Sequence, residues 1–479
     1  MTARTEWLVL GNAMLGNFLS GLSTRTFLIG LPTVAAGLGT DILGISWALI
    51  AFQLASISLS IVFGRLGDIY GRQGIYGLGF VTITVSAVLC GLAQNIVQLV
   101  AFRVLQGVGA AMTQSAARAL AVDAMPEGSV GKAQGFMTLA FHCGFLVGPP
   151  LGGFIVDHLN WRWIFFLLVP IGLAGVAFTS LGLRARTPPH RGEVHRPLDY
   201  GGALMFIALM VLVITLLDRR IAGYVSTGPR SLLAVALGGI LVGFLVHESR
   251  APSPLMNLSL FRIRMFAYSV VSLLSIAVTY GLVDFMMPFY LQEVLHLAPS
   301  FIGIIFLAAP ICTIALAPLS GYLADRIGPR IPATMGVIPF VAASVLGMLL
   351  RADSHWSLPT AMLALIGVGN ALFNAPNHAA VFNAVPKEER GFATGAIYSV
   401  FGFGHMLGVS LSGVLLTIAF QHYSGMPGAT PNPHNGGAFV SSMNVSYGAA
   451  LIMSLVALGF SVMRGDAKNP GPHTMGSKA

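Results

Sequence analysis

The sequence has little charge and little cysteine for its length. Of its 479 residues only 9% are charged, and three are cysteine. A water-soluble protein of this size could not cover its apolar interior with so few charges, so a soluble globular fold is excluded. Cys90, Cys143 and Cys312 all lie within apolar stretches and are interpreted as small buried hydrophobic residues. This placement argues against a disulfide framework or a cysteine metal site.

Motifs for ATP use and for metal-assisted hydrolysis are also missing. The sequence contains neither a phosphate-binding loop of the GxxxxGK[ST] type nor an HExxH zinc motif. We therefore expect no enzyme, no ATP-driven pump, no metal and no cofactor. Nothing at the N-terminus resembles a cleaved signal peptide.

Long apolar stretches dominate the chain instead. Hydrophobic residues make up 55% of it, and the mean hydropathy is +0.79. Each stretch is long enough to cross a hydrocarbon core of about 30 Å. The pattern predicts an all-α polytopic membrane protein with about fourteen transmembrane helices. We place these at residues 7–35, 44–64, 74–93, 97–121, 132–156, 161–182, 199–217, 228–246, 264–291, 300–323, 332–351, 358–384, 391–420 and 443–463.

The distribution of basic residues predicts the orientation. Of the 26 Lys and Arg residues, 18 fall in segments on the side of the N-terminus, five fall on the opposite side and three fall within predicted spans. Cytoplasmic loops carry such an excess, so both termini are predicted to be cytoplasmic. The net charge of +9 is therefore a topology signal, and a nucleic-acid partner is not expected. The segment Gln421–Met443, rich in Pro, Gly and Asn, is the longest predicted outside loop.

A repeated motif indicates that the chain has two related halves. Gly64–Arg72 (GRLGDIYGR) has a counterpart 257 residues later in Gly321–Arg330 (GYLADRIGPR). Paired repeats of this kind are typical of secondary transporters. We predict an N-terminal six-helix bundle at 1–184, a linker with two inserted helices at 185–262, a C-terminal six-helix bundle at 263–464 and a tail at 465–479. The charged segment Arg184–Leu198 marks the join.

Four segments together resemble one family. Gly64–Arg72 resembles the loop signature G-x-L-x-D-x-x-G-R of the major facilitator superfamily. Arg103–Ala111 resembles R-x-x-Q-G-x-G-A-A, and Gly144–Gly153 resembles G-x-x-x-G-P-x-x-G-G, both from its drug:proton antiporters. Pro197–Gly202 resembles the entry to the inserted helices of fourteen-helix members. The resemblance implies the major facilitator fold, with two six-helix bundles and two inserted helices.

The resemblance also implies a function. It points to a secondary active transporter that exports small organic compounds by proton antiport with alternating access, as in multidrug efflux and antibiotic resistance. The alternatives are a dedicated exporter of a metabolite, siderophore or lipid-like compound, an uptake symporter, or a membrane protein without a transport role. The expected location is the cell (inner) membrane, with the proton gradient in place of a cofactor. The expected partners are a small-molecule substrate and the bilayer, with the chain working as a monomer; a periplasmic adaptor and outer-membrane channel stay open.

The first span departs from the family pattern. Related exporters carry an acid in a stretch like D-x-T-x-x-N-V-A-L-P, whereas this chain has Ser23 at the acidic position and adds Arg25. A cavity with one acid and at least two arginines suits neutral or anionic substrates better than lipophilic dications. The sequence therefore predicts a neutral or anionic substrate.

The repeated loops carry the candidate cytoplasmic gate. Asp68 precedes the third span, where a carboxylate meets the positive end of a helix dipole. The resemblance implies that Asp68 pairs with Arg118 and latches the cytoplasmic side, and the gate assignment also includes Arg72 and Asp325. The alternative is a charged loop that fixes topology only.

The fifth span carries the candidate antiporter motif. Gly144, Gly148 and Gly152 recur every four residues and predict a smooth face for close helix contact. Pro149 removes a backbone hydrogen bond. The resemblance implies that this motif, which ends at Gly153, seals the two bundles together; the alternative is a plain packing face.

Buried polar residues supply the candidate cavity and coupling site. Arg103, Gln106 and Gln114 form a polar stripe on the fourth span, and Asn370, Asn374, Asn377 and His378 form one on the twelfth, which predicts a shared aqueous cavity. Asp284 is the one acid well inside a predicted span, and Arg25 lies in a nearly repeat-equivalent place. Proton coupling is assigned to Asp284 with Arg25 and Arg103, and a permanent ion pair that never titrates is the alternative. His142, His378 and His405 also lie within spans; each is interpreted as a packing residue or a proton relay.

Overall fold

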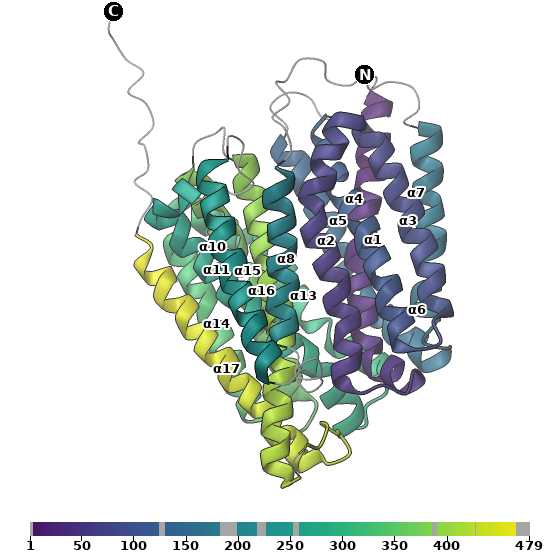
Figure 1. The fold of residues 1–479 in the computed structure, drawn as a ribbon, viewed down its shortest axis with the longest axis vertical. Helices are drawn as coiled ribbons and strands as arrows, with labels where there is room; N and C mark the ends of the chain where they lie inside the picture. Colours follow the sequence, from purple (N-terminus) through teal and green to yellow (C-terminus); the bar gives the residue numbers. More distant parts are fainter. Residues whose placement is uncertain are drawn as a thin grey trace, which may run out of the picture.

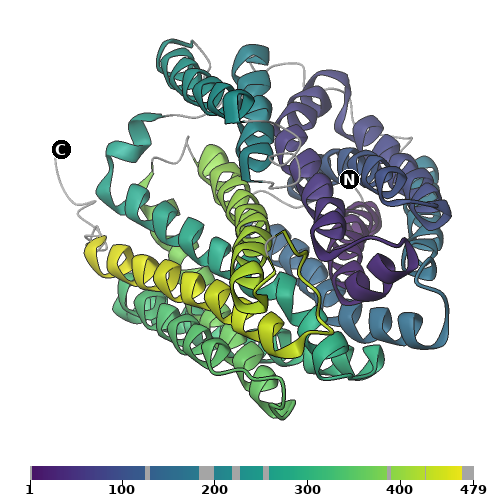
Figure 2. The same ribbon diagram turned by 60° about the horizontal axis from the view of Figure 1, so that its bottom comes forward.

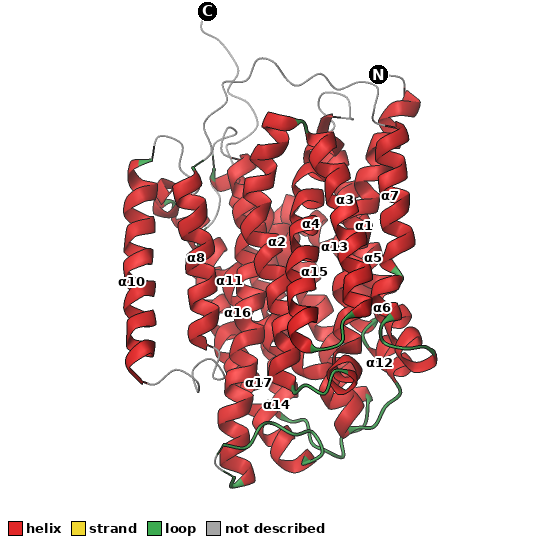
Figure 3. Cartoon of the chain, turned by 45° about the vertical axis from the view of Figure 1, so that its right-hand side comes forward, coloured by secondary structure: helices red, strands yellow, loops and turns green. Residues whose placement is uncertain are grey.

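The computed structural model describes residues 3–123, 130–182, 199–217, 227–251, 258–385, 390–426 and 428–465. In these residues the chain is all-helical, and Figure 3 shows helices joined by short loops. Eleven of the described helices are long and apolar enough to cross a membrane. The remaining three predicted spans fall on α1, α8 and α10. The expected all-α membrane architecture is confirmed.

The helices form two bundles and a peripheral pair. The first bundle contains α1 (Ala3–Gly37), α2 (Ile42–Tyr70), α3 (Arg72–Leu92), α4 (Ile96–Asp123), α5 (Val130–His158) and a last span interrupted between α6 (Trp163–Phe166) and α7 (Leu168–Gly182). The second contains α11 (Arg264–Phe289) with the π-helical turn η2 (Tyr290–Val294), α12 (Pro299–Ile305) with α13 (Ala308–Ile327), α14 (Arg330–Met348), α15 (Ser357–Ala384), α16 (Arg390–Ser424) and α17 (Gly436–Met463).

Two helices lie outside the bundles. They are α8 (Tyr200–Leu217) and α10 (Thr227–Arg250), and the short helix η1 (Leu258–Arg262) precedes α11. Figures 2 and 3 show α8 and α10 side by side at the edge of the molecule, with α8 nearer the bundles. Both helices expose large apolar side chains, such as Leu204 on α8 and Val235 on α10, which suits contact with lipid. The predicted linker and tail fall largely on residues outside the described ranges.

The first and the last described helix have their outer ends on the same side of the molecule. α1 begins and α17 ends at the upper end of the molecule in Figure 1, which we call the terminal end; the opposite end is the far end. An even number of spans places the ends in this way. The longest far-end loop is shorter than predicted, because α16 continues to Ser424 and α17 starts at Gly436. The predicted start of the last span at Met443 was therefore wrong, since α17 begins seven residues earlier, at Gly436.

Candidate functional site

An ion pair joins the two bundles in the interior of the protein. Arg25 lies on α1 and Asp284 on α11, and Arg25 Nη1 is 2.8 Å from Asp284 Oδ2. Each residue is only 4% exposed. A buried charge is stable in an apolar interior only when it is paired and hydrogen-bonded. The pair therefore links the bundles by a contact that must be replaced if they separate.

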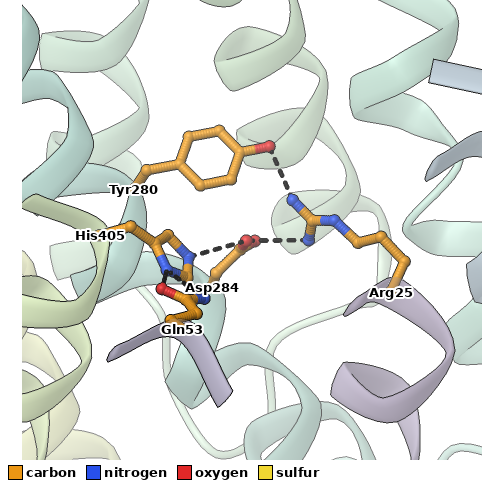
Figure 4. Close-up of polar contacts among 5 residues, drawn as sticks. All are labelled: Arg25, Gln53, Tyr280, Asp284 and His405. Carbon is orange, nitrogen blue, oxygen red and sulfur yellow. Dashed lines mark hydrogen bonds and ion pairs between the residues drawn. The ribbon is translucent and has the colours of Figure 1, made fainter. Parts of the chain in front are cut away.

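Three further polar side chains surround this pair (Figure 4). Tyr280 Oη accepts a hydrogen bond from Arg25 Nη2 at 3.0 Å. On the other side, His405 Nε2 of α16 lies 3.8 Å from Asp284 Oδ2, and His405 Nδ1 is 3.0 Å from Gln53 Nε2 of α2. Four helices thus converge on one polar cluster, two from each bundle. We call these five residues the central cluster.

Helix geometry explains how α11 contributes two members of the cluster. Tyr280 and Asp284 are four residues apart, so their side chains share one face of the helix. Pro288 follows four residues later and has no N–H to donate to the carbonyl of Asp284. The π-helical turn η2 begins two residues after it. The helix that carries the acid therefore has weakened backbone bonding just beyond it, on the side of the far end.

A small pocket opens beside the pair. Arg25, Tyr280 and Asp284 form its polar wall, and the remaining lining is apolar: Phe145, Pro149, Phe306, Ala309, Pro310, Leu363 and Ile366. The Arg25 guanidinium lies 3.7 Å from the centre of the Phe145 ring, close enough for a cation–π contact. Both bundles contribute to this wall, so relative movement of the bundles changes its shape.

The glycines of α5 let this helix pack closely against α1 of its own bundle. A Cβ atom at Gly144 would collide with the backbone of Phe18 in α1, and one at Gly148 would lie 2.7 Å from Arg25 Cβ. Gly152 packs in the same way on Thr26 of α1. The predicted face for close helix contact thus lies against α1 and fixes the backbone that carries Arg25.

The end of the same motif contacts the opposite bundle. A Cβ atom at Gly153 would collide with the carbonyl of Pro299, at the start of α12. A Cβ atom at Gly303 of α12 would in turn collide with the carbonyl oxygen of Pro149. Backbone contacts of this kind need both glycines, because any larger side chain would separate the helices. The motif therefore contacts α1 of its own bundle and α12 of the other, and the sealing role that the resemblance implies stays a prediction.

Two side-chain contacts also hold the two bundles together at the far end. Thr33 of α1 exchanges hydrogen bonds with Gln292 of η2 at 3.1 and 3.3 Å. Asp157 of α5 accepts hydrogen bonds from the hydroxyl and the amide of Ser300 in α12. The bundles are therefore held together at the far end in this conformation.

The fourth-span residues are divided between two environments. Arg103 is fully buried in the first bundle, where it donates to the carbonyl of Ala48 and to Oε1 of Gln106. The rings of Phe27 and Phe52 lie 4.4 and 4.3 Å from its guanidinium. Gln114, further along the helix, donates to Ser20 of α1 at 2.8 Å. The contacts of Arg103 and Gln106 are therefore internal to the first bundle and do not include the central cluster.

The polar residues of the twelfth predicted span, on α15, also lie in different surroundings. Asn370 accepts a hydrogen bond from Asn374 at 3.3 Å, so these two amides pair along α15. Asn377 is instead fully buried, accepts a 2.9 Å hydrogen bond from Arg464 and donates to the carbonyl of Ser269. It serves packing at the terminal end of the second bundle, and its predicted place in the cavity does not match these contacts. His378 lies half-buried on the same helix.

The candidate gate lies largely outside what the structure describes. The side chains of Asp68, Arg118 and Asp325 are outside the described residues, and Arg72 begins α3 directly after Gly71. The latch therefore stays a prediction.

Replacing Asp68 tests the latch. Asp68→Asn should abolish transport at unchanged protein level in the membrane, because the amide lacks the negative charge that is attracted to the helix N-terminus and to Arg118. Asp68→Glu should keep part of the activity; full transport by Asp68→Asn would reduce the loop to a topology determinant.

Sequence reasoning missed two members of the central cluster. Tyr280 could have been found, because it lies one helical turn before the acid that is deepest in a predicted span. Gln53 is a polar residue inside an apolar span, which is also a usable signal. Neither position reveals that Gln53 contacts His405, since their helices belong to different bundles and the contact depends on how these pack.

This architecture defines a class of protein. Two helical bundles joined by a buried ion pair, a pocket between them and a closed far end describe a multi-pass membrane protein of the secondary-transporter type. The sequence profile of the Major Facilitator Superfamily matches residues 13–199 and 269–473. The chain belongs to this superfamily. The match omits residues 200–268, which include α8 and α10.

Related proteins are transporters. The chain is 27% identical over 458 residues to the riboflavin transporter RibZ of Clostridioides difficile, covering 95% of this chain and 96% of the relative. It is 30% identical over 416 residues to the multidrug resistance protein Stp of Mycobacterium tuberculosis, covering 86% of this chain and 76% of the relative. A crystal structure of a bacterial homologue of the human lysosomal transporter Spinster matches with a TM-score of 0.69 at 16% identity, covering 96% of this chain and 97% of that one. The last similarity supports the fold alone.

Proposed function

We propose that this protein is a proton-driven antiporter that exports small organic compounds across the cell (inner) membrane. The observation that carries the proposal is the buried ion pair between Arg25 and Asp284, which joins the bundles beside a pocket. Asp284 is the acid of the central cluster, and an ionisable residue inside a membrane protein marks an ion pathway or a substrate site. The proton gradient takes the place of a cofactor.

Alternating access gives the pair a role in coupling. With the far end closed, Asp284 is held by Arg25, and the paired carboxylate has given up its proton towards the terminal end. When the far end opens and the bundles separate there, the contact between α1 and α11 loosens and Asp284 can take a proton from the other side. Closing the far end restores the pair and expels that proton inward. A substrate that binds only to the paired site would move in the opposite direction.

The relatives support this class of function. Stp and the tetracenomycin C exporter of Streptomyces glaucescens are named as resistance or export proteins. The riboflavin transporter covers almost the whole chain and favours a second candidate, the transport of one dedicated metabolite. The two candidates differ in substrate range and share the coupling site.

The proposal is tested by proton flux in proteoliposomes. Purified protein is reconstituted with a pH-sensitive dye inside, and cationic, neutral and anionic compounds are added in turn. We expect a substrate-induced proton movement opposite to the substrate, for neutral or anionic compounds. Proton movement in the same direction as the substrate would indicate a symporter, and substrate movement without protons would contradict coupling. Competition among chemically unrelated compounds separates a multidrug exporter from a dedicated one.

The orientation is a further prediction. The excess of basic residues predicts that both termini are cytoplasmic and that the loop between α16 and α17 is outside. In a variant without the three native cysteines, a cysteine at the exposed Thr430 should react with an impermeant thiol reagent in intact cells. A cysteine at Ser477 should react only after the cells are opened. The reverse pattern would place the terminal end outside and would contradict the direction of export.

A further inference from the structure

The pocket wall carries one charge of each sign, and the two are already paired. Among the lining residues, the charged groups are Arg25 and Asp284, which are 2.8 Å apart. The wall is therefore electrically neutral while Asp284 is ionised. Any charged ligand finds its natural counter-charge occupied by the other member of the pair.

An anionic ligand would bind together with a proton, which gives symport and not antiport. It would compete with Asp284 for Arg25 and leave the displaced carboxylate buried without a partner. A buried unpaired carboxylate is unstable and takes up a proton. The anion and the proton would then bind together, and by linkage each would strengthen binding of the other. An antiporter needs the opposite relation, in which substrate and proton exclude one another.

A cationic ligand meets the reverse difficulty. It would compete with Arg25 for Asp284 and leave a guanidinium buried against the Phe145 ring and Tyr280. Removing one member of a buried ion pair is strongly destabilising, and the new contact would have to offset that loss. His405, 3.8 Å from the same carboxylate oxygen, leaves still less room for a second cation. Both signs of charge are thus disfavoured at this pocket.

The rest of the wall presents rings and aliphatic side chains. In this conformation the free space beside the pair is about that of one water molecule, so a ring ligand must displace side chains of the wall. Phe145, Tyr280 and Phe306 present aromatic side chains, and the other lining residues are aliphatic or proline. Aromatic pairs prefer stacked or edge-to-face contacts, which a flat ligand can make with several rings at once. Arg25 Nε is buried without a hydrogen-bond acceptor among the described residues. A ligand with an acceptor atom could satisfy this donor without disturbing the ion pair.

We propose that the substrate is an uncharged aromatic compound that carries a hydrogen-bond acceptor. This inference rests on the proposed function, because it uses proton antiport at Asp284 to exclude anions. It narrows the expectation of a neutral or anionic substrate to a neutral one. The ion pair acts as a charge filter. It does not oppose an uncharged aromatic ring or a hydrogen-bond acceptor, whereas a charged ligand can bind only by breaking the pair.

Three matched probes test the charge filter on the purified protein. Naphthamide, naphthoate and naphthylmethylammonium, substituted at the same ring position, share one ring system and differ in charge. Binding is measured by equilibrium dialysis near neutral pH, without a membrane gradient. We expect naphthamide to bind at least about tenfold more tightly than either charged probe. Equal or tighter binding of a charged probe, or no binding of naphthamide, would overturn the inference.

Substitutions at the pair should change the preference in opposite directions. Asp284→Asn leaves the wall positive and should shift the preference to naphthoate, whereas Arg25→Gln should shift it to naphthylmethylammonium. The double variant has a neutral wall again and should prefer naphthamide, so it tests the idea even if a single variant folds poorly. A double variant that prefers a charged probe would contradict the charge filter. A protein that prefers naphthamide but moves no protons in liposomes would instead contradict only the proposed antiport.

Discussion

Asp284→Asn is expected to abolish uphill, proton-driven transport while leaving exchange of substrate down its own gradient. Asparagine has nearly the same shape as aspartate, but it cannot carry and release the proton. Arg25 keeps its hydrogen bond with Tyr280 in this variant, and the amide oxygen of the introduced asparagine can still accept from it. We therefore expect folded protein with intact alternating access and no coupling. The measurement compares gradient-driven uptake with substrate counterflow in the same proteoliposomes.

The alternative is an ion pair that only stabilises the fold. In that case Asp284→Asn leaves Arg25 without its counter-charge, which costs about 3–5 kcal/mol, and folded protein should fall. Arg25→Gln together with Asp284→Asn should then restore the protein level. Asp353→Asn, at an exposed acid in the loop after α14, serves as the matched control and should behave like the wild type. Normal uphill transport by well-expressed Asp284→Asn protein would rule out Asp284 as the essential proton carrier.

Gly153→Ala should reduce transport by opening the far end. The added methyl group collides with the backbone of Pro299, and backbone at a helix start cannot rotate away as a side chain can. Overpacking of this kind costs about 1–3 kcal/mol, and that cost falls only on conformations in which α5 and α12 are in contact. The equilibrium should therefore move towards the far-end-open state by roughly 5- to 150-fold. Transport should fall, because the cycle must pass through the closed state.

The control for this prediction is Gly74→Ala. Gly74 lies on α3, and a Cβ atom at this position would have nothing within 4 Å, so its replacement tests the loss of glycine without a collision. A cysteine at Thr33, in a background without the native cysteines, reports the far end through its reaction with an impermeant thiol reagent. This replacement removes the hydrogen bonds to Gln292 from both variants alike, so the comparison between them is unaffected. Its labelling should rise in Gly153→Ala and stay unchanged in Gly74→Ala. Equal labelling and equal transport in the two variants would show that this contact does not hold the far end closed.

The sequence by itself determined the architecture. An apolar stretch of about twenty residues is long enough to cross a bilayer, and within the bilayer its backbone groups form their hydrogen bonds in a helix. The spans therefore follow from length and hydropathy. The glycine spacing in α5 likewise predicted a close helix contact, because small residues at every fourth position form one smooth face. The boundaries at the far end were less certain. α17 begins seven residues before the predicted start of its span, because the glycine and serine pairs around Ala438–Val440 are typical of loops.

The tertiary structure decided which polar residues act together. Arg25 and Asp284 stood out in the sequence as buried charges, but only the packing of α1 on α11 brings them to 2.8 Å. The same packing adds Tyr280, Gln53 and His405, and it directs Asn377 to Arg464 and away from the central cluster. Hydropathy tells which helices enter the membrane, whereas the rotation and register of each helix depend on contacts between residues far apart in the chain. For this reason the sequence specified a transporter fold, and the assembled bundles specified its central site.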